Sequence, residues 1–108
     1  MDEKIIKIAM DIILNAGHAR NSIKAATDAF GENHNDKVDS LLKEASEYLR
    51  VAHVKQTEII QEEARGIKHE IPLLFIHAQD TLMTIMSEYN MTNNFIKLIR
   101  SANKNGGK

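Results

Sequence analysis

Four polar side chains within one short segment, His77, Gln79, Thr81 and Thr84, have the chemistry that group transfer needs. In a helix of about 3.6 residues per turn, His77, Thr81 and Thr84 share one arc and Gln79 lies on the other side. A neutral imidazole is a good nucleophile, and hydroxyl or amide groups beside it could donate hydrogen bonds to a transferred anion. An isolated helical histidine is more often without chemistry, so the spacing alone leaves both interpretations open.

Asp80 is the carboxylate of the same segment, and its helical neighbours Leu73, Ile76 and Met83 are apolar. Burying a lone carboxylate among such residues is expensive. Asp80 therefore needs a specific partner, unless it is exposed or hydrogen-bonded within its own chain.

These residues must be positioned by helices, because apolar residues recur at steps of three and four along three stretches. Turn formers around residues 31–36, Gly66 as a helix end and Pro72 in a first turn near Ile71 set the boundaries. We predict helices over about 3–30, 36–66 and 71–101 in one domain, 1–102, with a flexible tail at 103–108. The fold class is all-α, an antiparallel three-helix bundle with a left-handed twist.

Gly17 falls inside the first predicted helix. Glycine in a helix interior costs about 1 kcal/mol relative to alanine. We therefore expect a bend or a close packing contact at Gly17.

The third predicted helix is apolar on two sides. One stripe consists of Phe75, Ala78, Leu82, Ile85, Tyr89, Ile96 and Ile99, and roughly opposite lie Leu73, Ile76, Asp80 and Met83. Two other helices can cover only one of these stripes. The economical cover for the second is another copy of the chain, which predicts a homo-oligomer.

The composition excludes several functional classes. The 108 residues include no cysteine, carry a formal charge of -1 with both signs interspersed, and contain no apolar run near the ~20 residues of a membrane span. We expect a cytoplasmic protein with no nucleic-acid partner and no membrane insertion. His34, His69 and the Glu62–Glu63 pair are expected to be solvated.

Two segments of this chain resemble the two characteristic segments of the lactose/cellobiose enzyme IIA family of the bacterial sugar phosphotransferase system. They are AHVKQTEIIQEEARG at 52–66 and LLFIHAQDTLMT at 73–84. The stretch AGHARNS at 16–22 is similar to the family's weaker N-terminal segment. The resemblance covers nearly the whole chain.

The resemblance implies a phosphoryl carrier in which His77 is the phosphorylated residue. His77 would accept the phosphoryl group from the carrier HPr and pass it to a cysteine of a IIB component, during disaccharide uptake through a membrane IIC transporter. Gln79, Thr81, Thr84, Gln56 and His53 are candidate pocket donors, some reaching across a subunit boundary. The structural alternatives are that Gln56 satisfies a buried group and that His53 only fills space.

The resemblance also implies a homotrimer in which Asp80 from each subunit meets at the threefold axis around a structural divalent ion, taken as magnesium. A hard cation with oxygen ligands would relieve the repulsion of three converging carboxylates.

The chain departs from the family at two positions: Thr81 stands where a second histidine is usual, and His18 replaces an aspartate. The competing functional classes are a non-catalytic trimeric interaction or regulatory module, and a metal-dependent enzyme built on Asp80 and nearby histidines.

Overall fold

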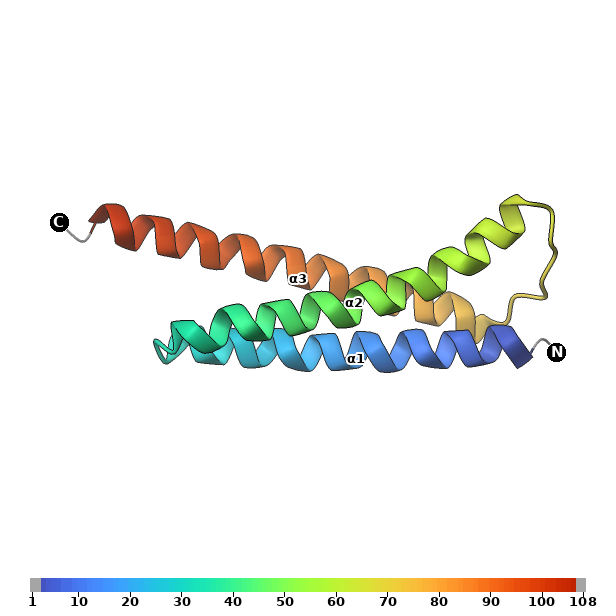
Figure 1. Ribbon diagram of the computed structural model, residues 1–108, viewed down its shortest axis with the longest axis horizontal. Coiled ribbons are helices and arrows are strands. Elements are labelled where there is room, and N and C mark those ends of the chain that lie inside the picture. Colours follow the sequence, from blue (N-terminus) through green and yellow to red (C-terminus); the bar gives the residue numbers. More distant parts are fainter. Residues whose placement is uncertain (1–2, 107–108) are drawn as a thin grey trace.

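Three long helices and two short connections make up the computed structural model, which describes residues 3–106. They are α1 (Glu3–Gly31), α2 (Asn35–Ala64) and α3 (Leu73–Gly106). Helices α1 and α3 run in the same direction and α2 runs against both (Figure 1). This confirms the predicted all-α, three-helix architecture.

The three helices do not pack equally. Helix α1 packs along α2 and also against α3, whereas α2 and α3 touch least. In Figure 1, α3 crosses α2 and the two separate toward both ends. The molecule is a rod of 61 × 21 × 18 Å, and α1 is the helix that holds it together.

The buried core follows the predicted spacing on α1 and α2. It is rich in alanine, which lets helix backbones approach closely. Its members on these helices include Ile5, Ala9, Ile12, Ala16, Ala19, Ile23, Ala45, Leu49, Ala52 and Ile59. On α3 the predicted inner stripe is buried from Phe75 to Ile85 and at Ile96. Ile99 is 45% exposed, because it lines an open pocket with Phe30 and Gly31 where α1 ends.

Both connections begin with the same backbone device. After α1, Asn33 takes the left-handed conformation (φ 64°) and the N–H of His34 donates to the carbonyl of Ala29 over 2.8 Å. After α2, Gly66 takes the left-handed conformation (φ 88°) and the N–H of Ile67 donates to the carbonyl of Glu62 over 3.0 Å. These bonds satisfy carbonyls that a helix end leaves unpaired.

The helix boundaries differ from the predicted ones by a few residues. Helix α2 begins at Asn35 rather than at Asp36, and α3 begins at Leu73 because Pro72 precedes the helix and its carbonyl accepts from the N–H of Phe75. Helix α3 also continues to Gly106, so residues 103–106 are helical instead of forming a tail. Extending an existing helix by a few residues costs little. Residues 107 and 108 lie outside the described part.

The expected bend at Gly17 is wrong. Helix α1 is continuous from Glu3 to Gly31 and runs straight in Figure 1. A Cβ atom built on Gly17 would meet nothing within 4 Å, so no close packing contact among the described residues explains the glycine either.

Ion pairs tie the helices together at three levels. Lys4 on α1 binds Glu62 on α2 over 2.8 Å at one end. Arg20 on α1 binds Glu88 on α3 through two bonds of 2.7 and 3.0 Å near the middle. At the other end Arg100 on α3 binds Asp39 on α2 over 2.9 Å and lies over the ring of Phe30. Exposed pairs add little stability, but these three fix which residues lie level with one another.

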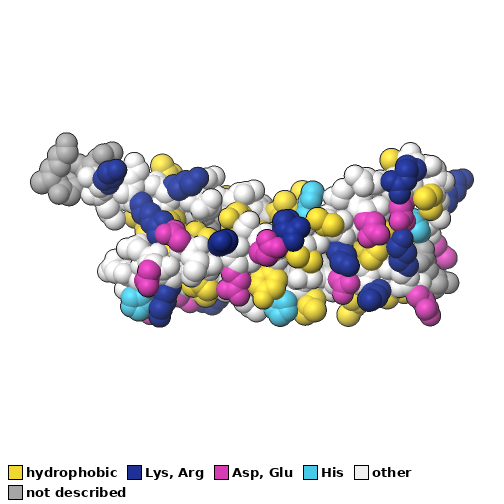
Figure 2. Space-filling model, viewed as in Figure 1, with side chains coloured by type: hydrophobic (Ala, Val, Ile, Leu, Met, Phe, Trp, Pro, Cys, Tyr) yellow, Lys and Arg dark blue, Asp and Glu magenta, His cyan; other side chains and the backbone are white. Residues whose placement is uncertain are grey.

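The surface shown in Figure 2 carries charges of both signs interspersed with apolar groups, as the composition predicts. Within residues 3–106, no helix is both long enough and apolar enough to span a bilayer.

Candidate functional site

His77 is exposed one turn after the start of α3. Its neighbours Phe75 and Ala78 are buried against the other helices, so the core fixes the backbone that carries the imidazole. Among the described residues the ring forms no hydrogen bond or ion pair. The imidazole is therefore accessible to an incoming group and is not held by its own bundle.

Thr81 is the polar side chain nearest to His77 along the same arc. It is half-buried, and Thr84 on that arc is exposed. The hydroxyls of Ser22 and Thr27 each donate to the backbone carbonyl four residues earlier, but the Thr81 hydroxyl makes no such bond within the described chain. Helical side chains lean toward the N-terminus, so the Thr81 side chain leans toward the turn that carries His77.

The arc of His77 borders α1. Glu88 lies eleven residues after His77, which is about three helical turns and returns to the same side of α3. The carboxylate of Glu88 forms an ion pair with Arg20 of α1. Gln79 projects roughly opposite His77, on the side of α3 that faces α2, and is half-buried. The structure thus keeps Thr81 and Thr84 beside His77 and sets Gln79 apart.

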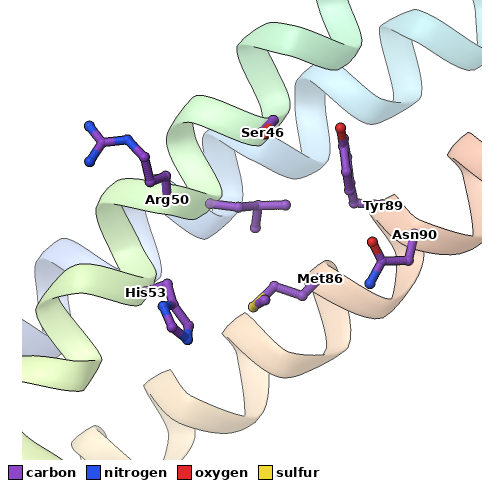
Figure 3. Close-up of a pocket in the computed structure, with 7 residues that line it drawn as sticks. Ser46, Arg50, His53, Met86, Tyr89 and Asn90 are labelled. Carbon is purple, nitrogen blue, oxygen red and sulfur yellow. The ribbon is translucent and has the colours of Figure 1, made fainter.

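His53 lines an open pocket of about 280 Å³ between α2 and α3. In Figure 3 the side chains of His53 and Met86 project into the space between the two helices, whereas Arg50 points away. A hydrogen bond from Arg50 holds the pKa of Glu47 below its ordinary value. The pocket is lined by Ser46, Leu49, Arg50, His53, Met86, Tyr89 and Asn90. Met86 lies about 13 Å along α3 from His77, so a single chain does not bring His53 to His77.

Gln56 is buried between Ala52 and Ile59 on α2, with 7% of its surface exposed. It forms no hydrogen bond with another described residue. No described side-chain nitrogen or oxygen is both fully buried and unpaired. The amide of Gln56 therefore reaches solvent at its tip, and it satisfies no buried polar group among residues 3–106.

Asp80 is exposed on the side of α3 where Ile76 and Met83 are also exposed. Its carboxylate makes no hydrogen bond or ion pair with any residue between 3 and 106. Over the same range no three His, Asp or Glu side chains come together as a metal site. A single Asp80 could supply only part of the oxygen ligands that a hard cation needs, so the remaining ligands would have to come from other copies of the chain or from water.

Comparison with known proteins decides the family. Residues 7–100 match the family described as the lactose/cellobiose-specific IIA subunit of the PTS system. The chain belongs to that family. It is 37% identical to the lichenan-specific phosphotransferase enzyme IIA component of Bacillus subtilis, covering 99% of this chain and 97% of the relative. It is 31% identical to the lactose-specific EIIA component of Lacticaseibacillus casei, covering 91% and 88%.

Solved structures agree with this assignment. The crystal structure of the cellobiose-specific enzyme IIA from Bacillus anthracis has a TM-score of 0.86 at 36% identity, covering 96% of this chain and 95% of that one. PtcA from S. mutans has a TM-score of 0.88 at 36% identity, covering 93% and 99%. The IIA chain is thus a phosphotransferase-system component that carries phosphoryl groups in sugar transport.

One cluster of this IIA chain was not foreseen from its sequence. The side chains of His69 and Glu62, expected to be solvated, are only 10% and 12% exposed and lie 2.6 Å apart. Hydrogen bonds from Lys4, first, and from His69 hold the pKa of Glu62 below its ordinary value. No local pattern signals the cluster, because Lys4 is 58 residues from Glu62 in sequence. It secures the connection that leads into α3.

His18, the other departure from the IIA family pattern, is remote from the His77 arc. Its ring lies 5.1 Å from that of Tyr48 on α2, centroid to centroid. Arg20, two residues later, reaches α3 instead. His18 therefore contributes to the contact between α1 and α2, and Thr81 is the departure that bears on the site.

Proposed function

We propose that His77 is the residue on which this IIA protein carries the phosphoryl group. The supporting observation is its position: a rigidly mounted imidazole, exposed and unpaired within the described chain. A carrier residue must meet two protein partners in turn, which a buried or hydrogen-bonded ring could not do without rearrangement.

The transfer needs little chemistry from the protein beyond positioning. A ring nitrogen of His77 bonds to phosphorus as the nitrogen–phosphorus bond of phosphorylated HPr breaks. In the second step the His77 bond to phosphorus breaks as a cysteine sulfur of a IIB component attacks. The phosphoryl group then passes to a disaccharide entering through a membrane IIC transporter, while the IIA protein stays in the cytoplasm.

Thr81 is our first choice of hydrogen-bond donor to the phosphoryl oxygens. Its side chain lies one turn from His77 and leans toward it, and its hydroxyl has no bond within the described residues. Gln79, Gln56 and His53 project elsewhere in a single chain, so they serve the transferred group only from a neighbouring copy. Thr81 thus takes the place of the family's usual histidine with a shorter donor.

We also propose that the functional assembly is a homotrimer built on the open face of α3, defined by Leu73, Ile76, Asp80 and Met83. Leu73, the first residue of α3, is 79% exposed, and Ile76 and Met83 are exposed beside it. Their alternating steps of three and four are those of a helix-to-helix seam. Asp80 from each copy would face the axis, where a divalent ion such as magnesium neutralises the converging carboxylates.

The test is phosphorylation of the purified protein with phosphoenolpyruvate, enzyme I and HPr. We expect labelling of the native chain and none of His77→Ala, with His34→Ala, which changes another exposed histidine, as the matched control. Unlabelled native protein, or labelled His77→Ala, would overturn the proposal and favour a non-catalytic helical module. Thr81→Val should slow labelling, and Thr81→His should restore it.

A further inference from the structure

The glycine at position 17 is not explained by packing among the described residues. It lies in the middle of α1 with an ordinary helical backbone, and an added Cβ atom would meet nothing within 4 Å. Alanine would therefore fit and would favour the helix. A missing side chain at such a place is useful when another molecule approaches the helix closely.

The surroundings of Gly17 are apolar and uncovered. Met10 and Leu14, seven and three residues earlier, lie on the same side of the helix, and they are 54% and 59% exposed. Ile6 and Ile13 border them and are half-buried. We call Ile6, Met10, Ile13, Leu14 and Gly17 the α1 patch.

The α1 patch lies beside His77. Helices α1 and α3 run in the same direction (Figure 1). Arg20 and Glu88 are joined by two bonds, so these two positions are level with each other. His77 lies eleven residues before Glu88, and eleven residues before Arg20 is Ala9, the neighbour of Met10. The patch therefore includes the level of the imidazole and continues along α1 on the side that the His77 arc borders.

We infer that the α1 patch is the docking surface for the protein that delivers the phosphoryl group to His77, with Gly17 leaving room for that protein's closest approach. The inference rests on the proposed function. A second copy of the chain is less suited to the α1 patch, because such a copy can bind the longer apolar surface on the open face of α3, on another side of the molecule.

The charge at the edge of the patch suits a phosphorylated partner. Lys7 is exposed, adjoins Met10 and Leu14 on the helix surface, and forms no ion pair with residues 3–106. An unpaired cation attracts the anionic phosphohistidine at encounter. The patch is also small, which suits a carrier that must release its donor before it meets its acceptor.

The decisive variant is Gly17→Leu, because leucine favours the helix and the space around Gly17 is open. We expect the KM for phosphorylated HPr to rise about tenfold or more with kcat unchanged, since the added side chain blocks docking and leaves the chemistry intact. Leu14→Ser should raise KM in the same direction. Val54→Ser is the matched control, because Val54 is equally exposed but lies on α2, and it should leave KM unchanged.

Two further measurements separate the outcomes. Phosphoramidate, a small phosphoryl donor that needs no docking surface, should phosphorylate His77 at the same rate in all variants, which isolates docking from the proposed carrier role. An unchanged KM in Gly17→Leu would overturn the inference while leaving that role intact. A change in the molar mass of Gly17→Leu by light scattering would overturn it too, because it would show that another copy covers the patch.

Discussion

The two faces of α3 have opposite environments although their sequences are similarly apolar. The inner face, defined by Phe75, Ala78, Leu82 and Ile85, is buried against the other helices. The open face, Leu73, Ile76, Asp80 and Met83, is exposed in the single chain. His77 lies on the border between them.

This difference shows which apolar surface of α3 a single chain buries and which surface only another molecule can bury. The inner face obtains its stability from contacts present in every folded chain. The open face has apolar surface whose burial would contribute about 25 cal/mol per Å² only when another molecule covers it. The inner face can therefore position a residue at the border, such as His77, and a molecule bound to the open face can supply further side chains beside it.

The largest effect expected from a single change is on the inner face. Leu82→Ala should lower the free energy of unfolding by about 2–5 kcal/mol, because Leu82 is fully buried and its loss leaves a cavity. Urea denaturation followed by circular dichroism measures this. A loss below about 1 kcal/mol would mean that the inner face is not the core that the structure describes.

A change on the open face should affect assembly and leave the fold intact. Met83→Lys should convert the proposed trimer to monomers, because a charge on the seam cannot be buried without a partner. Light scattering would give the mass, and circular dichroism should show unchanged helix content. Val54→Lys, a charge introduced at an equally exposed position of α2, should leave the mass unchanged. A Met83→Lys trimer would mean that copies meet elsewhere.

Most of the inner face could be predicted from the sequence, because a helix core depends on local periodicity. The stripe predicted on α3 correctly identifies its buried residues Phe75, Ala78, Leu82 and Ile85. The prediction is wrong at Ile99, where the spacing continues but α1 ends at Gly31 and leaves the side chain on an open pocket. The pattern records which way a side chain points and carries no information on whether a neighbour is present.

The site could be predicted less completely, for a related reason. Helical spacing places Thr81 beside His77, and the structure agrees. It does not say which helix each arc faces, so it does not show that His53 lines a pocket with Met86, about 13 Å along α3 from His77. The contacts of His69 with Glu62, and of Glu62 with Lys4, join distant segments and leave no periodic signal.

The metal proposal gives a smaller effect that tests the open face at one residue. Adding EDTA should lower the melting temperature of the assembly, because three Asp80 carboxylates would repel one another without a cation. In a domain of this size about 1 kcal/mol corresponds to about 4–8 °C. Asp80→Asn removes the charge, so its melting temperature should not respond to EDTA. Asp36→Asn, at another exposed aspartate, should respond as the native protein does.

The smallest effect concerns the cluster that holds the connection into α3 and so orients both faces. Lys4 and His69 lower the pKa of Glu62 from 4.5, so the folded state favours the ionised carboxylate. The resulting stabilisation is complete above about pH 4.5, the ordinary value, and is lost as the pH falls through the lowered folded-state pKa. Glu62→Gln should therefore melt lower than the native chain near pH 6 and approach it near pH 3. Glu63→Gln, at an exposed neighbour with no ion pair among the described residues, should track the native chain throughout. Parallel curves for Glu62→Gln and the native chain would show that the cluster does not couple the ionisation of Glu62 to folding.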